Sequence, residues 1–229
     1  MTATTPERLN KYLALQLGIS RREADNLIAQ GKVTLDGTVA TLGARFTTET
    51  IAVSGKPLNR QTAMQYIALH KPVGYVCSRK AQGDAPTVYD LLPPELHSLK
   101  LVGRLDKDSS GIILLTNDGD FAYQMTHPKF VKTKVYEVHL DHELEPLHQQ
   151  MINDYGVTLD DGVSKFALMR LSDTQREDWQ VTMSEGRNRQ IRRTFTALGY
   201  TVARLHRTHF GTYALGDMKP GNYKTVNIQ

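Results

Sequence analysis

Cysteine is nearly absent from the 229-residue sequence: Cys77 stands alone, which excludes an internal disulfide and any metal site built from a cysteine cluster. Its apolar flank Tyr75-Val76 predicts a small buried residue. No apolar run approaches the roughly 18–20 residues that a membrane span needs, and the opening MTATTPERLNKY has no apolar signal core. These absences predict a cytoplasmic protein with no membrane partner.

Signals for nucleotide hydrolysis and for metal binding are also missing. The Gly-Lys pairs at 31–32 and 55–56 do not have the spacing of a P-loop. His206 and His209 are spaced as H-x-x-H, but no further Cys or His pair lies near them in the sequence, which favours an RNA contact or a structural role over a metal site. The sequence therefore predicts neither nucleotide hydrolysis nor a metal site.

Charge is distributed unevenly along the chain, although the net charge is only +4. Residues 135–164 contain seven acidic residues and no Lys or Arg, whereas residues 186–216 contain six arginines and no acidic residue. Solvated helices usually intersperse both signs. The separation therefore predicts one strongly positive surface region, which suits a phosphate-rich partner.

Residues 1–60 are predicted to form a small separate domain. Leucines at helical spacing predict a helix over 8–17, the capping box Ser20-Arg21-Arg22-Glu23 predicts the start of a second helix, and Asp36-Gly37 predicts a hairpin turn. This order, with RLNKYLALQLGISRREADNLIAQGKVTLDG, resembles the S4 RNA-binding domain. The resemblance implies that three basic residues meet RNA phosphates: Lys11, Arg21 and Arg22.

Residues 55–62 are polar and are predicted to be a linker, with a second domain over 64–229. Strands outnumber helices there and mostly follow one another directly, which favours an α+β fold with a mixed, largely antiparallel sheet. Strands are expected at 66–70, 99–102, 112–116, 135–140, 165–171, 179–183 and 201–205, and helices at 87–92, 121–126, 145–153 and 188–198.

The stretch VGRLDKDSSGIILLTNDGDF, residues 102–121, places Asp106 immediately before an apolar strand. An Asp in such a turn is most often a cap or turn former. Four consecutive apolar residues, 112–115, nevertheless predict a buried strand, so the carboxylate of Asp106 should lie near the core and need a partner. The basic segment GRNRQIRRTFTALGY, residues 186–200, is the expected source of that partner.

Several motifs in order along the chain resemble the RsuA branch of pseudouridine synthases, which usually carries an S4-like domain at its N-terminus. They are HKPVGYVCS (70–78), GRLDKDSSGIILLTNDGDF (103–121), KVYEVHL (134–140), GRNRQIRR (186–193) and LHRTHFG (205–211). The resemblance implies the pseudouridine synthase fold, a ribosomal RNA or assembly intermediate as partner, no cofactor and a monomer.

The resemblance also implies the roles of site residues. Asp106 would be the catalytic carboxylate, with Tyr136 stacking on the target base and Arg192 forming an ion pair with the Asp. Further substrate-binding residues would be Arg104, Ile191, Leu205, Arg189 and Arg193. Some relatives carry His at the position of Arg189, and the Asn-Arg-Gln pattern here is closer to members that act on large-subunit rRNA.

The implied reaction breaks the C1′–N1 bond of a uridine, turns the freed base and rejoins it through C5. Asp106 could assist as a nucleophile at the sugar or as a base that forms a glycal, and the sequence leaves both open. An aromatic face such as that of Tyr136 holds a flipped base with roughly 1–3 kcal/mol, although a sheet-facing core tyrosine is the alternative. Burial raises a carboxyl pKa, so Arg192 would serve to offset the desolvation of Asp106.

Two other functions are consistent with parts of the pattern. A non-catalytic RNA-binding or ribosome-assembly factor would keep the same fold and basic segments. A nucleoside or glycoside hydrolase would need paired acids, but Asp106 and Asp108 are two residues apart, and a strand or turn is expected to aim them in different directions. Isomerisation of a uridine in rRNA, with the large subunit favoured, is the main prediction.

Overall fold

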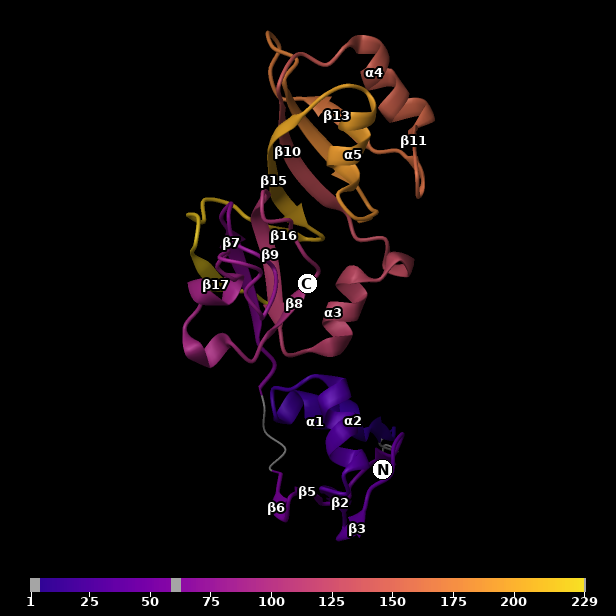
Figure 1. Ribbon diagram of the computed structural model, residues 1–229, viewed down its shortest axis with the longest axis vertical. Helices are drawn as coiled ribbons and strands as arrows, with labels where there is room; N and C mark the ends of the chain where they lie inside the picture. Colours follow the sequence, from indigo (N-terminus) through magenta and orange to yellow (C-terminus); the bar gives the residue numbers. More distant parts are fainter. Residues whose placement is uncertain (1–4, 59–62, 229) are drawn as a thin grey trace. The chain divides into compact units, whose positions relative to one another are not determined.

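The computed structural model describes residues 5–58 and 63–228. The chain divides mainly into an N-terminal unit up to Gln65 and a C-terminal unit from Tyr66 onward (Figure 1). No helix in these described ranges is both long enough and apolar enough to cross a membrane.

The N-terminal unit packs two helices against a small sheet, as the S4 resemblance implies. The capping box is confirmed: Ser20 Oγ accepts a hydrogen bond from the Glu23 amide at 3.1 Å, and the Glu23 carboxylate accepts one from the Ser20 amide. Leu9, Leu13 and Ile28 are buried between the helices and the sheet. The elements are β1 (Glu7–Arg8), α1 (Leu9–Gln16), α2 (Arg21–Ala29), β2 (Val33–Leu35), β3 (Thr38–Val39), β4 (Arg45–Phe46), β5 (Ile51–Val53) and β6 (Lys56–Pro57), with sheet order β3-β2-β5-β6 and a separate β1–β4 pair.

The start of the predicted linker is part of this sheet, which corrects the expectation for residues 55–58. Lys56 pairs with Val53 in an antiparallel turn, and the Leu58 amide donates to the Ile51 carbonyl at 2.8 Å. The turn at Ser54-Gly55 has a positive φ at both residues, which explains how so polar a stretch reverses the chain. Residues 59–62 of the linker lie outside the described residues.

The C-terminal unit is built on a mixed, largely antiparallel sheet in the order β13-β14-β10-β15-β9-β7-β17, so the predicted α+β fold is confirmed (Figure 1). Its strands are β7 (Tyr66–Lys71), β8 (Lys100–Val102), β9 (Ser110–Thr116), β10 (Lys134–Leu140), β13 (Ala167–Arg170), β14 (Asp178–Met183), β15 (Val202–Phe210), β16 (Tyr213–Ala214) and β17 (Tyr223–Thr225), with β11 (Val157–Leu159) and β12 (Gly162–Ser164) as a separate hairpin.

Two expected helices differ from the prediction. Residues 87–92 form only a 3₁₀ turn, Val88–Leu91, because Pro93 and Pro94 follow and stop the chain from continuing as a helix. The helix expected over 145–153 is α4 (Pro146–Gln150) followed by a π-helical turn, Met151–Tyr155. The remaining helical elements are the 3₁₀ turns Pro94–Leu96 and Pro128–Phe130, α3 (Gly119–Thr126) and α5 (Gln190–Ala197).

A parallel pairing between β9 and β15 joins the two antiparallel halves of the sheet. His206 pairs with Ser110 and Arg207 with Gly111. Gly111 has φ +114°, and a Cβ built on it would lie 2.2 Å from the carbonyl oxygen of Arg207. The junction therefore requires glycine at this position.

We expect Gly111→Ala to lower the free energy of unfolding by about 2–5 kcal/mol, because the methyl group combines backbone strain with overpacking against the β15 backbone. Urea unfolding followed by circular dichroism measures the change. Gly74→Ala is the matched control, since Gly74 also has a positive φ but nothing lies within 4 Å of the place that its methyl group would take. Equal losses in the two variants would show that strain alone, and not the close approach of Arg207, sets the requirement.

Candidate active site

A cleft of about 850 Å³ opens in the C-terminal unit beside the parallel junction. It is lined by the loop between β8 and β9, residues 103–109, by β10 and β15, and by the segment that leads into α5. Asp106, Tyr136, Arg104, Arg189, Ile191 and Leu205 all line it. The structure thus brings six of the predicted site residues together around one cavity.

The 103–109 loop that carries Asp106 is held from beneath by Lys71 at the end of β7. The Lys71 side chain is fully buried, and its Nζ donates to the Ser109 carbonyl at 2.6 Å and to the Pro72 carbonyl at 3.0 Å. Burial lowers the pKa of Lys71. A buried ammonium that bonds to loop carbonyls fixes the backbone on which Asp106 stands. Sequence reasoning missed Lys71, whose signal was a lysine at the end of the apolar run YIALHK.

Arg189 is the arginine that contacts Asp106. Its guanidinium lies 3.3 Å from Asp106 Oδ2 and also donates to both carboxylate oxygens of Asp108, each at 3.1 Å. The expectation that Asp106 and Asp108 point in different directions is therefore wrong, because the turn at residues 107–108 lets both reach one guanidinium. Arg189 is the N-cap residue of α5 and has the left-handed conformation, φ +45°, which is uncommon for a non-glycine residue and is found at functional sites.

Arg189 and Asp108 shift each other's pKa. The hydrogen bond that Arg189 donates to Asp108 raises the pKa of Arg189. Partial burial would raise the pKa of Asp108, but the hydrogen bond from Arg189 and the charges of Arg192 and Arg189 outweigh it and lower that pKa. Asp108 therefore stays ionised and keeps Arg189 in place between the two carboxylates.

Arg192 does not pair with Asp106 in this structure, which corrects the expected ion pair. Its guanidinium donates to the carbonyls of Val202 at 2.7 Å and Asp108 at 2.9 Å, and its Nε lies 3.4 Å from Asp108 Oδ2. The side chain is only 11% exposed, and burial lowers its pKa. Because α5 begins at Gln190, Arg192 lies over the loop backbone and Arg189 over the carboxylates. Arg192 thus fastens the 103–109 loop to β15.

Asp106 is less buried than expected, with 33% of its side chain exposed. Solvent reaches it through the cleft, so the desolvation that the sequence suggested is only partial. Tyr136 is buried, at 8%, and lies at a register shift between β10 and β15, where a bulge changes the direction of a side chain. Ile191 and Leu205 are buried at the apolar wall of the cleft, whereas Arg104 is exposed at its rim.

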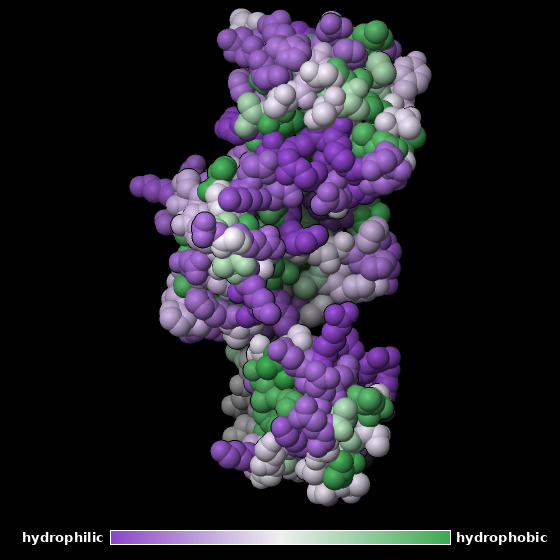
Figure 2. Space-filling model, viewed as in Figure 1, coloured by the Kyte–Doolittle hydropathy of each residue, from purple (hydrophilic) through white to green (hydrophobic). Residues whose placement is uncertain are grey.

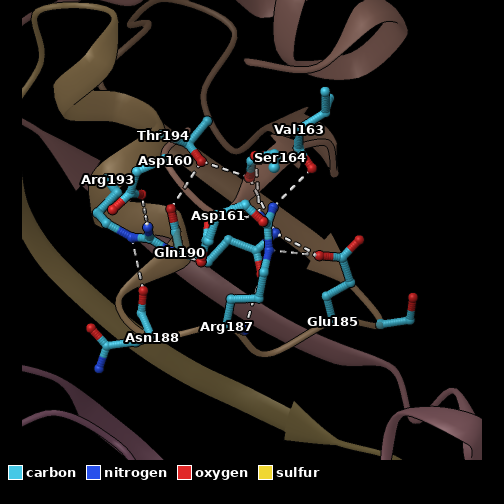
Figure 3. Close-up of polar contacts among 12 residues, drawn as sticks. Asp160, Asp161, Val163, Ser164, Glu185, Arg187, Asn188, Gln190, Arg193 and Thr194 are labelled. Atoms are coloured by element: carbon cyan, nitrogen blue, oxygen red, sulfur yellow. Dashed lines mark hydrogen bonds and ion pairs between the residues drawn. The ribbon is translucent and has the colours of Figure 1, made fainter. Parts of the chain in front are cut away.

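Arg193 lies away from the cleft wall. Together with Arg187 it holds the tip of the β11–β12 hairpin: Arg193 pairs with Asp160 and Asp161, and Arg187 donates to the Asp161 carboxylate at 2.8 Å (Figure 3). The hydrogen bond from Arg193 lowers the pKa of Asp161. A substrate-binding role for Arg193 thus finds no support in this geometry.

Folding brings part of the expected acidic segment against the basic one. The acidic and basic segments come together through these hairpin pairs, and Arg204 lies 3.8 Å from Glu137. Figure 2 shows hydrophilic residues gathered over α5 and the loop before it, but arginines of this region form ion pairs with Asp106 and Asp108. Among the described residues, the cleft-lining cations with no ion pair to a carboxylate are Arg104, Lys107, Lys132, Lys134 and Arg207.

The N-terminal unit presents the basic residues that the S4 resemblance indicated. Arg21 and Arg22 are exposed at the start of α2, and Arg21 donates to Asn10 on α1 at 3.1 Å. Lys11 lies on α1, 4.0 Å from Glu7. Both helices therefore contribute cations to this small domain.

Cys77 and the two histidines have contacts of other kinds. Cys77 is half-buried at the cleft, where its Sγ accepts a hydrogen bond from the Leu105 amide at 3.3 Å and burial raises the pKa of the thiol. His206 Nδ1 lies 2.8 Å from Ser110 Oγ, and His209 Nδ1 lies 3.0 Å from Thr208 Oγ1. In the described ranges, no three metal-ligating side chains come together.

Two family models match the chain. The model described as RNA pseudouridylate synthase matches residues 65–197, and the S4 domain model matches residues 7–50. A solved structure described as a pseudouridylate synthase superimposes with a TM-score of 0.69 at 30% identity, covering 96% of each chain.

Curated relatives match over nearly the whole chain. The ribosomal small subunit pseudouridine synthase A of Yersinia pestis is 37% identical over 97% of this chain and 95% of the relative, and that of Escherichia coli (strain K12) is 35% identical over 96% of each. The ribosomal large subunit pseudouridine synthase B of Pseudomonas aeruginosa is 34% identical over 96% of this chain and 60% of the relative. The chain belongs to the RNA pseudouridylate synthase family, with an S4 domain ahead of the synthase domain.

Proposed function

We propose that the protein isomerises one uridine of ribosomal RNA to pseudouridine, with Asp106 as the catalytic carboxylate. The observation that carries this proposal is the placement of Asp106 in a cleft that also holds Tyr136 and an apolar wall of Ile191 and Leu205. A flat base that leaves the RNA stack fits such a cavity, and its sugar can then meet the carboxylate. The positive residues at the cleft, such as Arg104 and Lys132, suit the RNA backbone.

Ribosomal RNA as the substrate is supported by the names of the relatives, all of which act on ribosomal subunits. The two relatives named for the small subunit are 37% and 35% identical to this chain, and the Pseudomonas aeruginosa relative named for the large subunit is 34% identical. The Asn-Arg-Gln motif favours a uridine of the large subunit, and separate assays on 16S and 23S rRNA decide the choice. We propose that the enzyme acts as a monomer, and a ribosomal RNA substrate is consistent with a cytoplasmic location.

Release of tritium from uridine labelled at C5 tests the function, because isomerisation removes that hydrogen while the base stays on the RNA, which neither binding nor hydrolysis does. Separate assays with 16S and 23S rRNA, each free and in assembling subunits, identify the substrate. A non-catalytic assembly factor would bind without releasing tritium, and a hydrolase would liberate free uracil. Either result would overturn the proposal.

The S4 unit is expected to contribute phosphate contacts. Replacing Lys11, Arg21 and Arg22 together by Gln should make the slope of log Kd against log salt shallower by about 2–3, because each of the three lost contacts removes roughly 0.7 for single strands or 0.9 for duplex RNA. Filter binding across a salt series measures the slope. The control replaces the exposed Lys56 and Lys80 by Gln. If the triple variant and the control change the slope equally, the S4 helices do not specifically contact the substrate.

A further inference from the structure

Arg207 is buried on the floor of the cleft. The residue is 2% exposed, and its Nε donates to the Ile112 carbonyl of β9 at 2.9 Å. It lies two residues after Leu205 on β15, so both side chains lie on the same face of the sheet, and both line the cleft. Its guanidinium stacks on the ring of Phe210, 4.7 Å from the centroid.

The charge of Arg207 has no carboxylate partner among the described residues, and its Nη2 is buried without a hydrogen bond. The other arginines of the segment form ion pairs: Arg187, Arg189, Arg192, Arg193 and Arg204. A second cation, Lys134, lies nearby, with its Nζ 5.7 Å from the centroid of the same Phe210 ring. A buried cation without a counterion destabilises a fold, and an anion that binds beside it during function would offset this cost.

Tyr136 lies directly opposite Arg207 across the β10–β15 pair. Residues opposite one another in an antiparallel pair have Cβ atoms about 4.5–5.5 Å apart, with their side chains on one face. A base that stacks on Tyr136 would therefore have the edge of its ring near the guanidinium of Arg207. RNA phosphates, which remain outside on the backbone, would meet the exposed cations of the cleft rim such as Arg104.

Uridine isomerisation creates an anion at this place. When the C1′–N1 bond breaks, its electron pair stays with the base, and the negative charge spreads over N1, O2 and O4. The base turns, C5 bonds to C1′, the C5 proton leaves to solvent and N1 takes up a proton, so no atom is gained or lost. The same anion forms in either route. If Asp106 attacks C1′, C5 later displaces the carboxylate from C1′; if Asp106 removes the 2′ proton, the resulting glycal regains a proton at C2′ as C5 bonds to C1′.

We infer that Arg207 stabilises the negative charge on the uracil base after it leaves C1′, by donating from its free Nη2 to a carbonyl oxygen of the base. This inference rests on the proposed function. A preorganised donor in a water-poor site is worth more in the transition state than in the ground state, because the charge develops only as the bond breaks. Arg207 is thus a catalytic residue of the isomerisation, separate from the carboxylate of Asp106.

Single-turnover rates on RNA with uridine or 5-fluorouridine at the target position test this role. Fluorine withdraws electrons and stabilises the departing base, so cleavage depends less on Arg207. We expect Arg207→Gln to lose about 10²–10³-fold with uridine, as for removal of one oxyanion donor, and at least tenfold less with 5-fluorouridine. Loss of the starting nucleoside in nuclease digests is measured, with RNA affinity checked by filter binding. Arg207→Lys, which keeps the charge, should retain more activity than Arg207→Gln.

Equal losses on the two substrates, or no loss, would overturn the inference and leave Arg207 as a structural link between β9 and β15. If Arg207→Gln does not fold, wild-type rates on RNA with 2-thiouridine or 4-thiouridine at the target decide the question. Sulfur is the weaker hydrogen-bond acceptor, so one thio substrate should react at least tenfold more slowly than uridine. Rates within twofold on all three would overturn the inference. An inactive wild type would instead contradict the proposed function.

Discussion

Asp106→Asn is expected to abolish isomerisation, with a loss of more than about 10⁴-fold, the upper end of what a positioned acid–base group contributes. The amide keeps the size and the hydrogen-bonding position of the carboxylate beside Arg189, so RNA affinity should stay within a few-fold of wild type. The amide lacks the charge and basicity that either a nucleophile or a base at the sugar requires. Tritium release under single-turnover conditions, at saturating enzyme, measures the loss.

Asp108→Asn is the matched control, because Asp108 shares the loop and the Arg189 contact but does not line the cleft. We expect this variant to retain turnover within about tenfold of wild type. Its stability should change by no more than about 1 kcal/mol, since the Asp108 side chain is 48% exposed. Turnover by Asp106→Asn together with an inactive Asp108→Asn would exchange the roles of the two carboxylates.

The central part of the fold was predictable because its local signals agree with the tertiary structure. The apolar run 112–115 is fully buried in β9, and the alternation in KVYEVHL places Tyr136 and Val138 inward on β10. Asp106 therefore stands at the end of a buried strand, as its place before that run suggested. Its catalytic role remains a prediction.

The spacing of the arginines did not predict which of them contacts Asp106. Periodicity places Arg189, Arg192 and Arg193 on faces of one helix, but the first turn starts only at Gln190, so Arg189 leaves the helix and reaches the carboxylates. The acidic turn Asp160-Asp161 lies far away in the sequence and approaches α5 only through the β11–β12 hairpin, which no strong strand signal announced. When this hairpin packs against α5, Asp160 and Asp161 form ion pairs with arginines that are distant in the sequence.

The burial of Arg207 was missed for a different reason. The strand expected over 201–205 continues to Phe210, and the continued alternation from Leu205 places Arg207 on the buried face. Because the expected strand ended at residue 205, Arg207 was grouped with the arginines of the predicted positive surface. The guanidinium lies under the cleft because β15 pairs in parallel with β9, with Arg207 opposite Gly111. This pairing joins two segments that are far apart in the sequence, so no local pattern predicts its register.

Arg192→Met is expected to lower both stability and rate, whereas Arg189→Met should lower the rate alone. Methionine removes the donors to the Val202 and Asp108 carbonyls, which costs about 1–3 kcal/mol and lowers the Tm by about 3–10 °C. A loosened 103–109 loop also displaces Asp106, and a displacement of about 1 Å is enough for a 10²-fold loss of rate. Arg189 is 42% exposed, so its loss should leave the Tm within about 2 °C.

Thermal melting and single-turnover tritium release on the two variants separate these roles. In Arg192→Met the two losses share one cause, so Arg192→Lys, which can still donate to one carbonyl, should recover part of both. A different result would restore the ion pair that the family resemblance implied: Arg192→Met with an unchanged Tm and a lost rate, beside a fully active Arg189→Met. In that case Arg192 would act on Asp106 directly during turnover, and Arg189 would hold the carboxylate only in the absence of RNA.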